Sequence, residues 1–246
     1  AAIAVSVGNL NDNAPAFAAM DANTVLVVTE GSTVFTSGSA QLVATDADMP
    51  TVGSTENEPL TYSLVVASVE PIEAEDLFSI DQATGLIGVA AEIDFEYLAG
   101  VMGGAPSNTL TVSFNVLVTD GKYTSEPMAV KIQVQDKNEF RPQFDQDSRT
   151  TVTISEVVPV NTRVFAVTAT DADESPLNSD VEYAIAEIGG AASTTFFAVE
   201  DLPSGSVSPA GVERYVRLET PLSPGEYSVT VTAKNSRADA VGDAVC

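Results

Sequence analysis

Residues 111–119 read TVSFNVLVT, and every second side chain from Val112 to Val118 is apolar. A period of two that is rich in β-branched residues is typical of a half-buried antiparallel strand. The same alternation occurs over residues 131–135, 165–170 and 228–233. Between such runs lie turn-forming pairs, namely Thr84-Gly85, Asp120-Gly121, Ser204-Gly205 and Pro224-Gly225. We find no long helical stripe, so the pattern predicts an all-β protein built from sandwiches of about 100–120 residues.

The chain contains an internal repeat. VATDAD at 43–48 returns as VTATDAD at 167–173. Further pairs follow in the same order at offsets of about 115–127 residues. These pairs are Glu30 and Glu156, Pro15 and Pro142, Tyr62 and Tyr183, and Asp120 and Asn235. One unit of structure is therefore expected to occur twice.

The repeat sets the expected domain boundaries. We predict that residues 17–141 form one repeat and residues 142–246 a second, while residues 1–16 are the tail of a preceding repeat and its linker. Ile3, Val5 and Val7 alternate like Ile132 and Val134 at the end of the first repeat, and so predict a strand. Because the sequence starts and stops abruptly, we expect a piece of a longer protein, with any targeting or anchoring segment outside it.

The composition excludes several classes of function. The chain has 35 acidic and 10 basic residues and a net charge of -25, which argues against nucleic acid and anionic membranes as partners and favours cations. It has no histidine, so a Ser–His or Cys–His couple cannot form. The single cysteine, Cys246, rules out an intrachain disulfide, a thiolate zinc site and an iron–sulfur cluster. We predict that the chain is not an enzyme and has no small-molecule substrate.

Carboxylates and amides gather at the ends of predicted strands and in two segments that close with proline, NLNDNAP at 9–15 and DKNEFRP at 136–142. In D-A-D at 46–48 and 171–173, and in D-F-E at 94–96, two acids stand two residues apart, so in an extended chain they point to one side. Like charges at about 4 Å repel by about 4 kcal/mol at an effective dielectric near 20. Ca²⁺ accepts six to eight mixed oxygen ligands and would offset this repulsion, whereas Mg²⁺ requires stricter geometry.

These residues together resemble the cadherin family. The linker motif D-x-N-D-N-x-P-x-F is matched by NLNDNAPAF and DKNEFRPQF, and the remaining motifs are matched by Glu30, both D-A-D sites, D-F-E and FSIDQATGLI at 78–87. The resemblance covers nearly the whole chain and implies tandem seven-strand Greek-key, immunoglobulin-like β-sandwiches with Ca²⁺ bound between them.

The resemblance also implies the ligands. At the junction between the two repeats they are Glu30, Asp94, Glu96, Asp136, the Lys137 carbonyl, Asn138, Glu139, the Phe140 carbonyl, Asp171, Asp173, the Asn178 carbonyl and Asn235. At the junction before the first repeat they are Asn11, Asp12, Asn13, Asp46, Asp48, Asn57 and Asp120.

Three positions of the second junction depart from the family pattern. Glu139 replaces the usual Asp, Phe140 the usual Asn, and Asn235 the usual Asp. We expect Phe140 to be harmless, because only its carbonyl is needed, and Asn235 to weaken the outer ion, because a charge is lost. The second repeat also lacks a D-x-E motif, so the junction after it is expected to be partly or wholly free of calcium despite Glu156.

Plainer interpretations stay open for single residues. The D-A-D acids, Asp120 and Asn235 can be ordinary turn residues, and Asp94 and Glu96 a solvated strand edge. Phe17, Phe144, Tyr62 and Tyr183 are predicted to be core aromatics.

The predicted function is that of a calcium-dependent cell-adhesion ectodomain. The resemblance implies a location on the extracellular side of the plasma membrane, a membrane-anchored parent protein and another cadherin ectodomain as homophilic or heterophilic partner. The alternatives are a structural spacer, a mechanical tether or a carbohydrate-binding array in a secreted or surface protein.

Overall fold

The computed structural model describes residues 3–5, 7–8, 10–18, 25–38, 40–48, 59–103, 107–145, 151–189, 196–200, 214–235 and 244–245, the last pair and 186–189 by their backbone alone. The chain divides into two compact units. Unit 1 comprises Ala1–Ala105 and Thr109–Gln135, and unit 2 comprises Pro106–Asn108 and Asp136–Cys246. Within the described residues, no helix has both the length and the hydropathy needed to cross a membrane.

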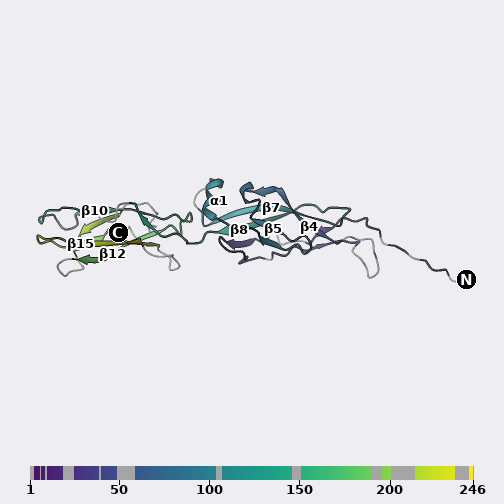
Figure 1. The fold of residues 1–246 in the computed structure, drawn as a ribbon, viewed down its shortest axis with the longest axis horizontal. Coiled ribbons are helices and arrows are strands. Elements are labelled where there is room, and N and C mark those ends of the chain that lie inside the picture. The colour runs from purple at the N-terminus through teal and green to yellow at the C-terminus, as the bar shows by residue number, and fades with distance from the viewer. Residues whose placement is uncertain are drawn as a thin grey trace. The chain divides into compact units, whose positions relative to one another are not determined.

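Unit 1 has two layers of strands (Figure 1). One layer is a four-stranded sheet in the order β2 (Leu26–Thr29), β8 (Met128–Gln135), β7 (Thr109–Thr119) and β4 (Thr61–Glu70). The other consists of two strand pairs, β1 (Ala16–Phe17) with β3 (Ala44–Thr45) and β5 (Phe78–Ile80) with β6 (Ile87–Val89). A bridge between Gln41 and Leu86 connects these two pairs.

The alternation of β7 places one face of the sheet in the core. Val112, Phe114, Val116 and Val118 are at most 2% exposed, while the residues between them are partly exposed. They pack with apolar residues from β2, β8 and the helix α1 in one cluster of buried side chains. Full burial of one such side chain stabilises the fold by about 1.5–3 kcal/mol. The half-buried strand predicted for 111–119 is confirmed.

One pairing differs from the expectation of antiparallel strands. β2 runs parallel to β8, with Leu26 opposite Ile132 and Thr29 opposite Gln135. Periodicity reports which face of a strand is buried, and both directions of pairing leave that face unchanged. The direction is instead set by the connection, because β1 and β2 enter different sheets.

A helix occupies the segment that was expected to be extended around D-F-E. α1 (Phe95–Met102) begins after Asp94, whose side chain caps it, and ends at Gly103 in the left-handed conformation with φ 59°. Phe95 and Leu98 are buried, whereas Tyr97 is 56% exposed. A short 3₁₀ helix, η1 (Ile72–Ala74), lies between β4 and β5. Helices as short as these do not produce a long helical stripe, so the sequence pattern did not predict them.

Unit 2 repeats the layered arrangement. One sheet has the order β12 (Val181–Gly189), β15 (Ser228–Asn235) and β16 (Ala244–Val245), and a second the order β10 (Arg163–Val167), β14 (Arg214–Leu218) and β13 (Phe197–Val199). A third pairs β9 (Gln143–Phe144) with β11 (Ala169–Thr170). The single run predicted over 165–170 is thus divided at Thr168, because its halves pair with different strands.

Equivalent aromatic pairs anchor the two units. The backbone N–H of Ala44 donates to the Tyr62 hydroxyl at 3.1 Å, and that of Ala169 donates to the Tyr183 hydroxyl at 2.6 Å. Phe17 lies 6.2 Å from the Tyr62 ring, and Phe144 the same distance from Tyr183. Tyr62 is buried in the core as predicted, and Phe17, Phe144 and Tyr183 are partly buried and pack against the cores. The matching contacts support the internal repeat.

The strand predicted at the start of the chain does not form. Ile3, Val5 and Val7 are 81–90% exposed, and none of the described strands pairs with them. A strand requires a neighbour for its backbone N–H and C=O groups, and alternation alone does not supply one.

We predict that Phe95→Ala costs about 3–5 kcal/mol of unfolding free energy, because it leaves a cavity in the core under α1. Tyr97→Ala, on the exposed face of the same helix, should cost less than about 1 kcal/mol. Urea unfolding at a fixed calcium concentration measures both. Equal effects would contradict the packing described for α1.

Candidate metal sites

The predicted ligands lie at the ends of strands, where side chains emerge from the core. Each of six directly follows or ends a strand: Glu30 after β2, Asp46 after β3, Asp120 after β7, Asp136 after β8, Asp171 after β11 and Asn235 at the end of β15. Because β7 and β8 are antiparallel, with Thr109 opposite Gln135, Asp120 lies at the end of unit 1 opposite to that of Gln135. β7 has 11 residues, so these ends are about 35 Å apart.

The D-A-D acids of unit 1 hold the first linker. Asp48 is 5% exposed, and its carboxylate accepts hydrogen bonds from the backbone N–H of Asp12, at 2.8 Å, and of Asn13, and from Asn13 Nδ2 at 2.6 Å. The Asp48 N–H in turn donates to Asp46 Oδ1 at 2.7 Å. Burial acts to raise the pKa of Asp48, but these donors outweigh it and hold that pKa below its ordinary value.

The D-A-D motif of unit 2 has the same geometry. The backbone N–H groups of Glu139 and Phe140 donate to Asp173 Oδ1 at 3.2 and 3.4 Å, and the Asp173 N–H donates to Asp171 Oδ1 at 3.0 Å. In both units the chain therefore folds back on the first aspartate. A local turn thus replaces the extended chain assumed for D-A-D. In unit 2 the two carboxylates nevertheless lie close enough for Asp171 to act on the pKa of Asp173.

Asp120 closes the linker end of unit 1. Its Oδ1 accepts from the backbone N–H groups of Lys122 and Tyr123 at 2.8 and 2.7 Å, and Lys122 Nζ donates to the Asn11 carbonyl at 2.6 Å. Asp120 is only 3% exposed, and burial acts to raise its pKa. The backbone donors and the Asn11 side chain overcome this effect, so the pKa of Asp120 lies below its ordinary value.

A second acidic group of unit 1 surrounds the start of α1. Glu30 is 2% exposed, and its Oε2 accepts from the Phe95 N–H at 2.7 Å. Asp94 Oδ1 accepts from the Tyr97 N–H at 2.7 Å. Glu96 lies in the first turn of the helix, with a carboxylate oxygen within 4.8 Å of one from Glu30. D-F-E is thus a helix start, where N–H groups stabilise negative charge, and not an extended pair.

Asp136 and Asn138 begin the linker that enters unit 2. Asp136 Oδ2 accepts from the Ser175 N–H at 3.1 Å and from Asn178 Nδ2 at 2.7 Å. Asn138 is 6% exposed, and both polar atoms of its side chain are buried without a hydrogen-bond partner. Ser175 was missed by sequence reasoning, since it contributes through its backbone, and only its place in a loop between two predicted ligands could have indicated it.

Phe140 lacks a side-chain donor that the equivalent residue of unit 1 has. Asn13, at the equivalent position, donates its side-chain amide to Asp48, whereas Phe140 has no side-chain donor for Asp173. Burial, with Asp171 nearby, raises the pKa of Asp173 to about 7, although the Glu139 and Phe140 N–H groups act against it. That Phe140 is harmless to the ion, because only its carbonyl is needed, stays a prediction.

Orphaned oxygens mark the same residues. Among the described residues, nine buried side-chain N or O atoms lack a hydrogen-bond partner, and eight belong to predicted ligands. They are Asn11 Oδ1, Asp46 Oδ2, Asp120 Oδ2, Asp136 Oδ1, Asn138 Oδ1 and Nδ2, Asp173 Oδ2 and Asn235 Oδ1; the ninth is Thr220 Oγ1. An unpaired buried polar group costs about 1–3 kcal/mol. The donor set of carboxylate and amide oxygens fits Ca²⁺.

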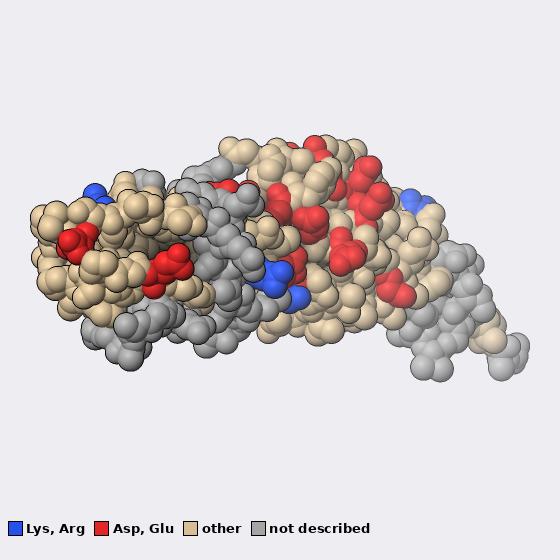
Figure 2. All heavy atoms as spheres, turned by 60° about the vertical axis from the view of Figure 1, so that its left-hand side comes forward, with Lys and Arg blue, Asp and Glu red and all other residues tan. Residues whose placement is uncertain are grey.

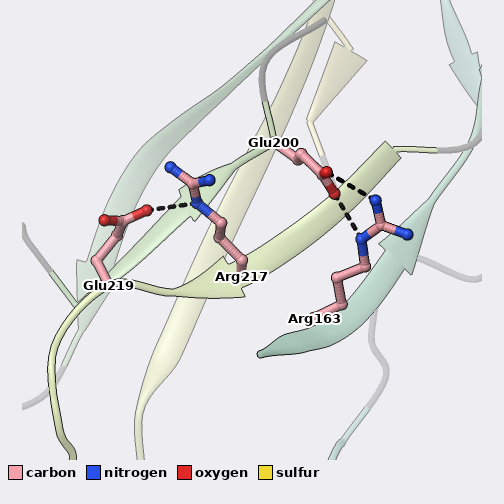
Figure 3. Close-up of polar contacts among 4 residues, drawn as sticks. All are labelled: Arg163, Glu200, Arg217 and Glu219. Atoms are coloured by element: carbon pink, nitrogen blue, oxygen red, sulfur yellow. Dashed lines mark hydrogen bonds and ion pairs between the residues drawn. The ribbon is translucent and has the colours of Figure 1, made fainter. Parts of the chain in front are cut away.

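Two arginines of unit 2 engage acids that are not predicted ligands. Arg163 binds Glu200 through two hydrogen bonds, of 2.6 and 2.7 Å, and Arg217 binds Glu219 at 2.6 Å (Figure 3). The Arg163 guanidinium lowers the pKa of Glu200. Acidic side chains outnumber basic ones on the face shown in Figure 2. Such exposed ion pairs contribute about 0–1 kcal/mol and do not neutralise the linker acids.

Lys137, Phe140 and Asn57 were also predicted as ligands. Lys137 Nζ lies 3.6 Å from Glu139 Oε2, in an exposed ion pair. Phe140 is 38% exposed. Asn57 lies outside the described residues.

The chain is similar to cadherins and protocadherins. It is 30% identical to protocadherin-11 X-linked of Sus scrofa over 178 residues, which cover 70% of this chain and 14% of that protein. It is 27% identical to cadherin-20 of Rattus norvegicus over 248 residues, covering 96% and 26%. The chain thus spans about a quarter or less of these relatives. No protein-family model matches it. Because the relatives are cadherins, the prediction that the chain is not an enzyme is confirmed.

The fold is also found in solved cadherin structures. The crystal structure of human protocadherin-24 EC1-2 matches with a TM-score of 0.59 and 24% identity, over 95% of this chain and 93% of that chain. This likeness confirms the predicted tandem immunoglobulin-like sandwiches.

We predict that, in chelator, stability falls as the pH rises from about 4 to about 7, because folded Asp173 keeps a proton that the unfolded chain has released. Asp173→Asn should remove this fall, and Phe140→Asn should reduce it by supplying a donor to the carboxylate. Urea midpoints at pH 5 and 7.5 measure it, and Glu226→Gln, at an exposed site, is the control. An unchanged pH profile in Asp173→Asn would contradict the assignment.

Proposed function

We propose that this chain, which belongs to the cadherin family, is part of an extracellular, adhesion-type ectodomain whose consecutive repeats are held in line by bound Ca²⁺. The observation that carries the proposal is the set of orphaned buried oxygens. Among the described residues, seven of the eight buried side-chain oxygens that lack a partner belong to residues assigned as ligands from the motifs.

Calcium is favoured over other cations by the donor chemistry. The ligands are oxygens of Asp, Glu and Asn, and the chain has no histidine and only one cysteine for a transition metal. They come from separate strand ends and linkers, which suits the variable coordination of Ca²⁺ better than the octahedron required by Mg²⁺.

The positions of the proposed ligands in the sequence explain why bound calcium would stiffen the linker. Glu30 and Glu96 belong to unit 1, while Asp136, held by Ser175 and Asn178 of unit 2, follows the last residue of β8 by one peptide bond. We infer that an ion taking oxygens from both units fixes the linker, so that calcium binding and alignment of the repeats are one event. Without the ion, repulsion among the acids loosens the linker.

Adhesion and location are inferred from the relatives. Cadherin ectodomains as partners, homophilic or heterophilic, and a membrane-anchored parent protein at the cell surface are in keeping with the protocadherin and cadherin relatives. A spacer or tether would use the same calcium-stiffened repeats but would need no adhesive face.

We predict that chelation with EGTA speeds tryptic cleavage after Lys137 at least tenfold and lowers the melting temperature. The linker is then no longer held by the ion, so the protease can reach it. Cleavage after Lys131, inside the hydrogen-bonded strand β8, is the internal control. Asp136→Asn should weaken the protection by calcium, whereas Glu126→Gln, at an exposed site of unit 1, should leave it intact. Equal cleavage rates with and without calcium would refute the proposed calcium linker.

We predict that beads coated with the chain aggregate in millimolar calcium and disperse in EGTA, if the adhesive face lies in these repeats. Mixing them with differently coloured beads that carry an unrelated cadherin tests whether the binding is homophilic. Beads that stay dispersed although the chain binds calcium would favour the spacer or tether.

A further inference from the structure

Asn235 has a side-chain amide that can donate hydrogen bonds, whereas Asp120, the equivalent residue of unit 1, has a carboxylate that can only accept them. It ends β15, is 3% exposed and pairs across the sheet with Val181. Its Nδ2 donates to Asp171 Oδ2 at 3.0 Å and also to the Asn178 carbonyl. Its Oδ1 is buried without a partner. One amide group thus joins the end of β15 to two points of the loop between β11 and β12.

Both acceptors of this amide are proposed calcium ligands. The N–H groups take one lone pair of each of these oxygens of Asp171 and Asn178. Because the amide hydrogens carry partial positive charge, they repel a cation placed beside them, so amide and ion compete for this position. The N–H groups satisfy both oxygens without any net charge.

The equivalent place in unit 1 has no such donor. Asp120 occupies the position of Asn235, and a carboxylate can only accept. Its Oδ2 is buried without a partner, and so is Asp46 Oδ2, the equivalent of the Asp171 oxygen that Asn235 holds. Where unit 1 has Asp120, Oδ2 of the first aspartate of D-A-D has no partner. Where unit 2 has Asn235, the same oxygen of the first aspartate accepts a hydrogen bond.

We propose that the side-chain amide of Asn235 takes the place of the outermost calcium ion of unit 2, so that this end is closed by hydrogen bonds while the corresponding end of unit 1 binds an ion. This inference rests on the proposed calcium function and goes further than a weaker affinity. It assigns one ion fewer to unit 2 and makes the Asp171–Asn178–Asn235 contact independent of calcium.

A reciprocal exchange tests the inference on the whole chain. Asn235→Asp should bind one more calcium per chain in equilibrium dialysis. In EGTA its melting temperature should fall by about 5 °C, because two hydrogen bonds are replaced by repulsion from Asp171. Calcium should restore it. Asp120→Asn, the matched change in unit 1, should bind one calcium fewer.

Asn235→Ala provides a second measurement if Asn235→Asp fails to fold. It removes the donor without adding a charge, so it should lower the melting temperature in EGTA and gain no ion. If the wild-type chain binds calcium but Asn235→Asp binds the same number and melts unchanged in EGTA, this inference is overturned alone. A wild-type chain that binds no calcium would overturn the proposed function itself.

Discussion

Buried oxygen atoms that lack a donor are the constraint on which both units depend. Hydrogen bonds satisfy these lone pairs one at a time, and among the described residues several of them have no donor. One cation with six to eight ligands satisfies several oxygens at once and also cancels their mutual repulsion. The core can be built from apolar side chains alone, but the ends of the strands cannot be closed in the same way.

The linkers are nevertheless positioned by hydrogen bonds that need no ion. In each unit the second aspartate of D-A-D accepts the N–H groups of two consecutive linker residues, 12 and 13 in unit 1 and 139 and 140 in unit 2. The first aspartate accepts the N–H of the second. These hydrogen bonds place the linker backbone beside the acids, although they do not offset the repulsion among the carboxylates. This preorganisation reduces the conformational entropy that an ion must overcome on binding.

Sequence patterns predicted the structural features that depend on the type of side chain. They missed the features that depend on which segments of the chain pair with one another. The core face of β7 follows from period two alone, because burial selects Val112 and Phe114 whatever strand lies beside them. The parallel pairing of β2 with β8 leaves no trace in that period. α1 escaped notice because eight residues show barely two turns, although Asp94 before it and Gly103 after it are ordinary helix boundaries. The ordered motifs predict the proposed ligands. The groups that donate to these residues, such as the Ser175 N–H, are backbone groups, and the type of residue does not indicate them.

Two amino-acid differences between the repeats change which residue supplies a side-chain amide donor to the D-A-D aspartates. In unit 1 Asn13 donates from the linker to Asp48, the second aspartate, while in unit 2 Asn235 donates from β15 to Asp171, the first. Phe140 removes the first kind of donor and Asn235 adds the second. Asp173 is left without a side-chain donor, and its pKa is raised to about 7, largely by burial, whereas the pKa of Asp48 is lowered. The two exchanges therefore change which aspartate of D-A-D has a side-chain amide donor, while the same backbone contacts hold both aspartates.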